Sequence, residues 1–289
     1  MSGSAPPASD PDGPEGVETA PRTPTARGWW WLLAALGALA VLILLVAEPW
    51  SVETEPTPTQ TYVPTPTQSA PSPSPSISVA PPGSDAVFDA TTSLGLFVTA
   101  ADLVADVPAA DPGVEERITS GQKGWGLPVG TVVEPDSCVL AVTVVAAPPA
   151  FYDVRSWGNE AMDFQQEVTV LTDPAAAREA FRELVTTIDA CPTYREVDTG
   201  VEGTSWTAQP AIEGQGVYPS IVLEVDRTVG GTTIPAYEGQ MLVGNTIVSW
   251  TAQALSGGTS ETALATLGDP ESLSAMVQGR AQLAVRALG

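Results

Sequence analysis

The chain has 289 residues, with 34 acidic and 11 basic side chains, no histidine and two cysteines. A formal charge of −23 argues against a nucleic-acid-binding protein, because that affinity depends on Lys and Arg replacing the counterions of phosphates. The lack of histidine excludes Ser-His-Asp and Cys-His catalysis and His-containing zinc sites, and two cysteines are too few for an iron–sulfur cluster. We therefore predict no catalytic, cofactor-binding or metal-binding residues.

Two N-terminal segments differ sharply in composition. Residues 1–28 contain six prolines and no periodic apolar pattern, which predicts a disordered tail. Residues 29–47 form an uncharged run of 19, close to the ~20 residues that cross a bilayer as a helix. A secretory signal usually has a shorter apolar run with a small-residue cleavage site, whereas Glu48-Pro49 follows here. We expect a single transmembrane helix rather than a cleaved signal peptide or a buried core helix.

The flanking charges predict the orientation of this helix. Arg22 and Arg27 precede it and the next basic residue is Arg117, so the positive-inside rule places residues 1–28 in the cytoplasm. Residues 48–85 contain ten prolines among Thr, Ser and Gln, which favours solvated polyproline II. This segment is a predicted extracellular stalk that reaches at most ~120 Å, at ~3.1 Å per residue. The predicted location is the cell membrane, with the C-terminal domain outside the cell.

Residues 86–289 are numerous enough for one globular domain, and they carry 26 acidic and nine basic residues, a net charge of −17. Two helices are predicted from the same Asp-Pro opening. Asp173 and Asp269 are candidate N-caps, each followed by a proline at the first helical position. Apolar residues then recur at helical spacing, as far as Ile188 in the first helix and to the C-terminus in the second. A short helix is also predicted over residues 100–107.

Runs with strand periodicity lie between the two long helices, at residues 164–171, 220–229, 232–242 and 246–255. Gly230-Gly231 and Gly244-Asn245 stand where tight hairpin turns are expected, so the last three runs predict an antiparallel meander. The predicted fold class is α+β, an antiparallel β-sheet flanked by α-helices. Residues 138–147 remain ambiguous, because their β-branched content favours a strand whereas Glu134-Pro135-Asp136 resembles a helix start.

The two cysteines, Cys138 and Cys191, both lie on the predicted oxidising side of the membrane. A disulfide is the simplest interpretation, and it would join the 135–147 segment to the end of the 174–190 helix. Closing a loop of this length stabilises the fold by roughly 4 kcal/mol in the chain-entropy model. Neither cysteine belongs to a Cys-x-x-Cys pair, so we expect a structural bond rather than a redox-active one.

Residues 120–130 contain two patterns that deserve comparison with catalytic motifs. Ser120 and Lys123 match the Ser-x-x-Lys spacing of penicillin-recognising enzymes, but glycines and a proline follow at once and no later Lys-Thr-Gly exists. The glycines fit neither a P-loop nor a dinucleotide fingerprint, so a mobile loop is expected. Trp125 within it either packs on the core, which is the favoured alternative, or stacks on a ligand.

Asp163, Gln165, Glu167 and Thr169 alternate with apolar residues and are predicted to share one face of a strand. Carboxylates at this spacing could serve acid–base hydrolysis of a cell-wall glycan. The ordinary alternation of antiparallel strands favours a solvated sheet face instead. No calcium-loop pattern is present, although the many acidic residues leave incidental cation sites open.

The layout resembles the PknH-like extracellular sensor domain of actinobacteria. The resemblance rests on residues 96–103 and 135–138, on residues 164–170 leading through Asp173-Pro174 to Cys191, and on residues 244–248 with the terminal helix. It implies an antiparallel sheet with flanking helices around a cleft that binds an extracellular ligand. The chain differs from the family in lacking a second disulfide and in having Ile188 where members often have a Trp. Its 28 N-terminal residues are also too few for a kinase domain.

We hypothesise a non-catalytic extracytoplasmic ligand-binding or sensor-like protein on a single-pass membrane anchor. Its expected partners are the membrane and an extracellular small molecule or envelope component, and its ligand-binding residues cannot be named from the sequence. Two alternatives remain open. One is a cell-wall hydrolase that depends on carboxylates alone, and the other is a structural envelope scaffold that binds a protein partner.

Overall fold

The computed structural model describes residues 81–198, 201–214 and 216–289. The predicted cytoplasmic tail, the predicted transmembrane helix and all of the predicted stalk before residue 81 lie outside the described residues. Within the described ranges, no helix combines the length and apolar character needed to cross a bilayer.

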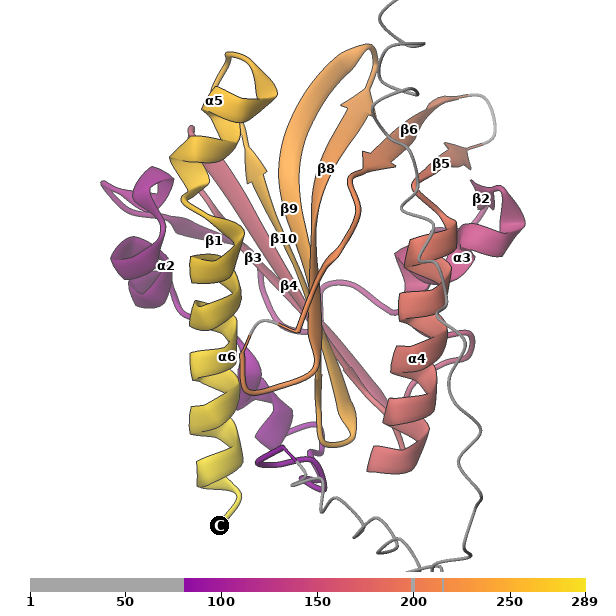
Figure 1. The fold of residues 1–289 in the computed structure, drawn as a ribbon, viewed down its shortest axis with the longest axis vertical. Coiled ribbons are helices and arrows are strands. Elements are labelled where there is room, and N and C mark those ends of the chain that lie inside the picture. Colours follow the sequence, from indigo (N-terminus) through magenta and orange to yellow (C-terminus); the bar gives the residue numbers. More distant parts are fainter. Residues whose placement is uncertain (1–80, 199–200, 215) are drawn as a thin grey trace, which may run out of the picture. The chain divides into compact units, whose positions relative to one another are not determined.

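The described residues build one twisted sheet of ten antiparallel strands (Figure 1). The strands β8, β9 and β10 follow one another as hairpins at its centre, and β7 (Ile212–Glu213) pairs with β8 off the main path. The order across the sheet is β1 (Glu115–Ile118), β3 (Phe151–Gly158), β4 (Met162–Val170), β10 (Thr246–Ala254), β9 (Thr232–Val243), β8 (Ser220–Val229), β6 (Val201–Ala208), β5 (Thr193–Asp198) and β2 (Thr131–Glu134).

Helices cover both faces of this sheet. In Figure 1 the longest helix, α6 (Pro270–Ala287), lies to the left of the sheet, and α4 (Pro174–Ala190) lies to the right. The α6 side also carries α2 (Ala100–Asp106), α5 (Ser260–Leu264) and the 3-10 turns η1 (Thr92–Leu96), η2 (Pro108–Ala110) and η4 (Ala265–Leu267). The α4 side carries α3 (Val139–Thr143) and the turn η3 (Asp136–Cys138).

The helix starts follow from the capping residues in the sequence. The Asp173 carboxylate accepts hydrogen bonds from the backbone N–H groups of Ala175 and Ala176, at 2.8 and 2.9 Å. The Asp269 carboxylate accepts one from Ser272 at 2.7 Å. Each cap satisfies backbone donors that the first turn of a helix leaves without partners. The two predicted Asp-Pro helix starts are confirmed.

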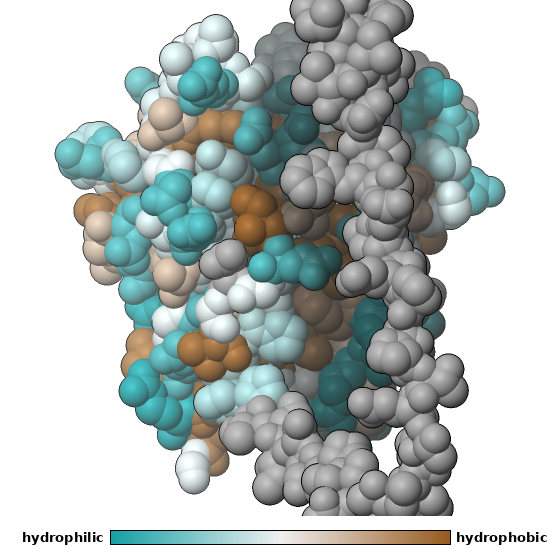
Figure 2. All heavy atoms as spheres, viewed as in Figure 1, coloured by the Kyte–Doolittle hydropathy of each residue, from teal (hydrophilic) through white to brown (hydrophobic). Residues whose placement is uncertain are grey.

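Each face of the sheet has its own hydrophobic core. On the α6 side, Phe164 and Trp250 stack with ring centroids 6.1 Å apart, and both are buried with Leu273 of α6. On the α4 side, Phe181 and Leu184 are buried with Ile247 of β10. Strand residues alternate between the two cores, as the period of two requires. On the side of α6 shown in Figure 2, hydrophobic residues occur in small groups between hydrophilic ones, which is typical of an amphipathic helix with a solvated outer side.

A glycine in the central strand β9 is required by this packing. A Cβ atom at Gly239 would lie 2.2 Å from Cε2 of Trp250, which is only 3% exposed on the neighbouring strand. We expect Gly239→Ala to lower the free energy of unfolding by about 1–3 kcal/mol, because a buried indole has little space into which to move. Urea denaturation followed by circular dichroism measures the change.

The matched control for this substitution is Gly279→Ala in α6, where an added Cβ meets no atom within 4 Å. Alanine favours the helical backbone over glycine by roughly 0.5–1 kcal/mol, so this variant is expected to be slightly more stable than the wild type. Equal stability of the wild type and the Gly239→Ala variant would show that Trp250 does not fix the spacing of β9 and β10.

The structure confirms the predicted meander and resolves the ambiguous segment. The strands β8, β9 and β10 match the predicted runs within one residue at each end, and Gly230, Gly231 and Gly244 adopt positive φ in the turns. Residues 139–143 form the short helix α3, so the strand alternative for the start of residues 138–147 is wrong. The predicted helix over residues 100–107 is observed as α2. Six further strands, β1, β2, β3, β5, β6 and β7, have no counterpart in the prediction.

Candidate functional site

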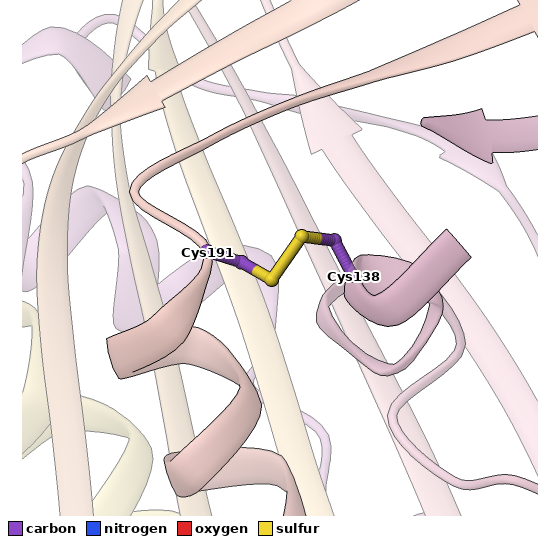
Figure 3. The surroundings of a disulfide bond; sticks show 2 residues. All are labelled: Cys138 and Cys191. Carbon is purple, nitrogen blue, oxygen red and sulfur yellow. A yellow bond between two sulfur atoms is a disulfide. The ribbon is translucent and has the colours of Figure 1, made fainter. Parts of the chain in front are cut away.

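The predicted disulfide between Cys138 and Cys191 is present and fixes the position of α3. Figure 3 shows it joining the start of α3 to the C-terminal end of α4. The two Cα atoms are 5.7 Å apart, and both cysteines are almost fully buried in the core of the α4 side. Because α3 has only five residues and no buried residue of its own, this bond adds a covalent attachment to the packing of Ala141 and Val142 on the core.

A cleft of about 380 Å³ opens on the α4 side of the sheet. The residues of α4 pack on the end of the sheet near the β9–β10 turn, where Leu242 and Ile247 are buried. Beyond that end, polar side chains of β4, β9 and β10 form the floor of the cleft. Ala141, Val142 and Val144 cover it on the opposite side. The volume lies within the range of sites that bind small molecules.

The floor of the cleft consists of cross-strand rows of polar residues. In the first row Glu167 of β4 is opposite Ser249 of β10, which is opposite Gln240 of β9. In the second row Gln165 is opposite Thr251, which is opposite Glu238. A third row pairs Asp163 with Gln253. The side chains share one face because residues two apart on a strand point the same way.

The wall formed by β5, β6 and β8 is aromatic and basic. Tyr194 and Trp206 stack with ring centroids 5.1 Å apart and planes at 12°. The guanidinium carbon of Arg227 lies 5.9 Å from the centre of the Trp206 ring, within cation–π range. Both rings are 8% exposed, so the wall is a packed surface with its polar groups turned toward the cleft.

The rim of the cleft is formed by the glycine-rich loop between β1 and β2. Trp125 is half-buried against the core of the α4 side, and its indole Nε1–H donates a hydrogen bond of 3.1 Å to the carbonyl of Thr143. The favoured interpretation of Trp125 as a packing residue is thus confirmed. The ammonium of Lys123 lies 3.5 Å from Oε1 of Gln165, at the edge of the floor.

The roof carries a backbone conformation that is rare for its residue type. Val144 has φ of 65° and ψ of −38°, and a hydrogen bond of 2.7 Å joins the N–H of Val145 to the carbonyl of Thr143 across it. This is a γ-turn with positive φ at a β-branched residue, which costs of the order of 1–3 kcal/mol. Val144 itself lines the cleft, so the strained residue belongs to the site.

All four carboxyl groups of the cleft are shifted toward their neutral form. Burial raises the pKa of Glu238 to about 7, with further increases from the charges of Glu167 and Glu196 and a partial decrease from Arg227. Burial likewise raises the pKa of Glu167, against hydrogen bonds from Tyr152 and Gln165 that favour its charged form. The pKa values of Asp163 and Glu196 are also raised by burial. Burial is thus the main cause of all four increases, and the nearby cations Arg117, Lys123 and Arg227 offset only part of it.

Several polar groups of the cleft have no partner among the described residues. The Glu238 carboxylate makes no hydrogen bond or ion pair there. Gln240 is 7% exposed, and its amide oxygen accepts a hydrogen bond from Ser249, but its amide nitrogen has no acceptor among the same residues. The buried Nε of Arg227 is similarly unsatisfied in the described part of the chain. Buried polar groups usually have partners, so the Arg227 Nε, beside two further polar groups open to the same cleft, indicates a place for a ligand.

The structure places the sequence candidates in two different environments. Asp163, Gln165 and Glu167 are brought together on the cleft floor, whereas Thr169 is fully buried beyond it. The predicted solvated sheet face is confirmed only in part, because Asp163, Gln165 and Glu167 remain partly exposed and alternate with buried residues, whereas Thr169 is buried. Ser120 instead donates a hydrogen bond of 2.6 Å to the buried Asp153, which also accepts one from the N–H of Gly121 at 2.9 Å. This serine closes a turn and is not among the residues that line the cleft.

Sequence reasoning missed the residues from the far strands, namely Glu196, Arg227, Glu238 and Gln240. Glu238 and Gln240 stand two apart within a predicted strand, which is the same signal that singled out Asp163 and Glu167. The pairing of β10 with both β9 and β4, which places these residues on one floor, depends on strand order. Among the described residues, no three Asp, Glu or Cys side chains lie close enough to hold one metal ion.

The fold and site define the chain as an α+β domain with one antiparallel sheet and a polar cleft on one face. No family model and no curated protein matches it. Among solved structures, it is similar to the extracellular domain of PknH from Mycobacterium tuberculosis, at 13% identity and a TM-score of 0.43, over 62% of this chain and 94% of that one.

It is also similar to an uncharacterised protein of Mycobacterium smegmatis, the Rv0999 ortholog, at 19% identity and a TM-score of 0.32. That match covers 60% of this chain and 86% of the other. The first neighbour belongs to the class of domain named from the sequence resemblance. Likeness at this level concerns the fold and says nothing about a ligand.

Proposed function

We propose that the domain is a non-catalytic binding module and that the cleft between the sheet, α3 and the Lys123 loop takes a small polar ligand. The observation that carries this proposal is a cavity of about 380 Å³ whose lining includes three polar groups without a partner among the described residues, namely the Glu238 carboxylate, the Gln240 amide nitrogen and the buried Nε of Arg227. Leaving a buried group such as the Arg227 Nε without a partner costs roughly 1–3 kcal/mol. A ligand that supplies the missing partners recovers that free energy on binding.

Binding is favoured over catalysis by the electrostatics of the carboxyl groups. Acid–base hydrolysis needs one carboxyl group held neutral as the acid and another held ionised as the base or nucleophile. Here the pKa values of Asp163, Glu167, Glu196 and Glu238 are all raised from their ordinary values. The environments push the four groups in one direction, so the site does not separate an acid from a base as this hydrolysis requires.

One observation keeps a hydrolase as the second candidate. A carboxyl group with a pKa of about 7, such as Glu238, has the proton affinity of a general acid at neutral pH. Turnover of an envelope glycan that is lost in Glu238→Gln would support this alternative. Recovery of the bound compound unchanged would support binding.

We further propose that the domain works outside the cytoplasm, held near a membrane by the segment over residues 29–47. The uncharged run of 19 residues and the asymmetry of the flanking arginines support this placement. The disulfide supports an oxidising compartment. Protease digestion of intact cells tests it, because a C-terminal epitope is expected to be lost without cell lysis.

Thermal-shift screening of the full-length chain against envelope lipids, muropeptides and sugars tests the proposed function. A ligand that binds the folded state raises the melting temperature by mass action. Thr251→Trp places a large ring at the centre of the floor, between Gln165 and Glu238, and is expected to abolish the shift. Thr232→Trp, at the exposed start of β9, is the matched control and should leave it unchanged. A shift that survives Thr251→Trp would place the ligand elsewhere.

A further inference from the structure

The charge of the cleft restricts the chemistry of its ligand. Four carboxyl groups line it against two basic groups, Lys123 and Arg227, and one of the four, Asp163, is ion-paired with Arg117 of β1 at 3.2 Å. The two carboxyl groups nearest the centre of the floor, Glu167 and Glu238, belong to β4 and β9, on either side of β10. Each raises the cost of ionising the other, as the effect of Glu167 on the pKa of Glu238 indicates. A positive charge placed between them relieves this repulsion.

The spacing of these groups favours a molecule over a single metal ion. Neighbouring strands lie ~4.8 Å apart, so carboxyl groups carried by β4, β9 and β5 are distributed over several strand spacings. A bound Ca²⁺ needs its oxygen ligands at ~2.3–2.6 Å from one centre. Within the described residues, no group of three acidic side chains meets that condition. A cation that is several atoms long can reach both the carboxyl groups and the neighbouring amides.

Groups that accept and donate hydrogen bonds lie beside this charge. Gln240, which is 7% exposed, points an amide nitrogen without a partner among the described residues into the same cavity. Thr251 lies between Gln165 and Glu238 in the second row of the floor. An ammonium group satisfies the carboxylates, and oxygen atoms further along the molecule satisfy the Gln240 amide nitrogen and the Arg227 Nε.

We propose that the cleft selects a small organic cation, whose ammonium group binds beside Glu167 and Glu238 and whose remaining polar atoms bind Gln240 and Arg227. This assignment rests on the proposed function, since it names the ligand class of the same cleft. Lys123, the one lysine of the chain, already supplies an ammonium group at the edge of the floor, 3.5 Å from Gln165. Its charge already acts on Glu167, so it competes with the ligand cation for that carboxyl group.

Calorimetric titration of the full-length chain with matched probes tests this assignment. The probes are 1,4-diaminobutane with the neutral 1,4-butanediol, and glucosamine with glucose. Both amines are expected to bind at millimolar concentration and both neutral compounds to bind at least tenfold more weakly. Glu167→Gln and Glu238→Gln should each weaken amine binding at least tenfold. Glu224→Gln, at an exposed position of β8, is the matched control and should leave it unchanged.

The Lys123→Met variant separates a competing role of the Lys123 ammonium group from a role in supporting the loop. Removing the competing ammonium is expected to tighten amine binding several-fold, whereas a lysine that only supports the loop would weaken it on removal. Amine affinity should also fall as the pH is lowered below about 7, because Glu238 then holds a proton. The charged and titratable groups that line the cleft with Glu238 are Asp163 and Glu167 from β4, Tyr194 and Glu196 from β5, Arg227 from β8 and Lys123 from the loop. Of these, Glu167, Glu196 and Arg227 act on the pKa of Glu238.

The outcomes separate this assignment from the proposed function. Equal binding of amines and their neutral counterparts, or no binding of either amine, overturns the cation assignment. If an uncharged or anionic envelope compound then binds the wild type but not Thr251→Trp, the cleft remains a binding site for a different ligand class. If Thr251→Trp changes the binding of no compound, both the assignment and the proposed function fail.

Discussion

Removing the disulfide by the double substitution Cys138→Ala and Cys191→Ala is expected to lower the free energy of unfolding by about 4 kcal/mol. The bond closes a loop across a separation of 53 residues, and the chain-entropy model gives this value for a loop of that length. Alanine leaves no unpaired polar group at these positions, which are 1% and 4% exposed. Urea denaturation of the oxidised wild type and the double variant measures the difference.

The loss should also be local, which provides a control within the same molecule. Hydrogen exchange is expected to become faster in α3, which the bond attaches to α4, and at the start of β5, which follows Cys191 in the chain, and to remain unchanged in α6. Wild-type protein that is reduced and then reoxidised should regain its original stability. Equal stability of the oxidised wild type and the double variant would mean that α3 is held by other contacts.

Replacing Glu238 with Gln is expected to raise the free energy of unfolding by about 2–3 kcal/mol at pH 8. The pKa of Glu238 is about 7 in the folded state, against an ordinary value of 4.5, so ionising it costs the folded state more than the unfolded one. A neutral amide of similar shape removes that cost. The gain should be complete above about pH 7 and should vanish below about pH 4.5, where the carboxyl group is protonated in both states.

The sign of the change in stability with pH distinguishes a carboxyl group that is costly to ionise in the fold from one that is stabilised by a salt bridge. Between these two pH values the folded state binds the extra proton, so wild-type stability falls as the pH rises. Glu224→Gln, at an exposed position of β8, is expected to change stability by less than ~0.5 kcal/mol at every pH. A destabilising effect of Glu238→Gln at pH 8 would show that Glu238 has a favourable charged partner in the fold.

The elements that the sequence predicted well are those whose signals are local. Asp173-Pro174 and Asp269-Pro270 supply caps within one turn of the helix, and the glycine turns join strands that are adjacent in the chain. The strands β1, β2 and β5 escaped prediction because they are short edge or near-edge strands with exposed, polar residues. Their pairing depends on contacts distant in sequence, such as Glu116 with Trp157 and Val132 with Val197.

The site was predictable only in part for the same reason. The alternation of Asp163, Gln165 and Glu167 was visible in the sequence. A strand face that is open to solvent and one that lines a polar cleft have the same alternating pattern, so the sequence does not distinguish them. What distinguishes them is the cover provided by α3, and that cover depends on the disulfide from Cys138 to α4. Arg227 and Glu196 join the site through the order of β8, β6 and β5, which no local motif encodes.

Calorimetric titration of the full-length wild type and of Thr251→Trp, with the compound that gives the largest thermal shift, tests the central claim most directly. The predicted result is saturable binding at one site in the wild type, no measurable binding in the filled variant, and recovery of the compound unchanged. Binding of the same strength in both proteins, or conversion of the compound to a product, would contradict the conclusion that this cleft is a non-catalytic ligand site.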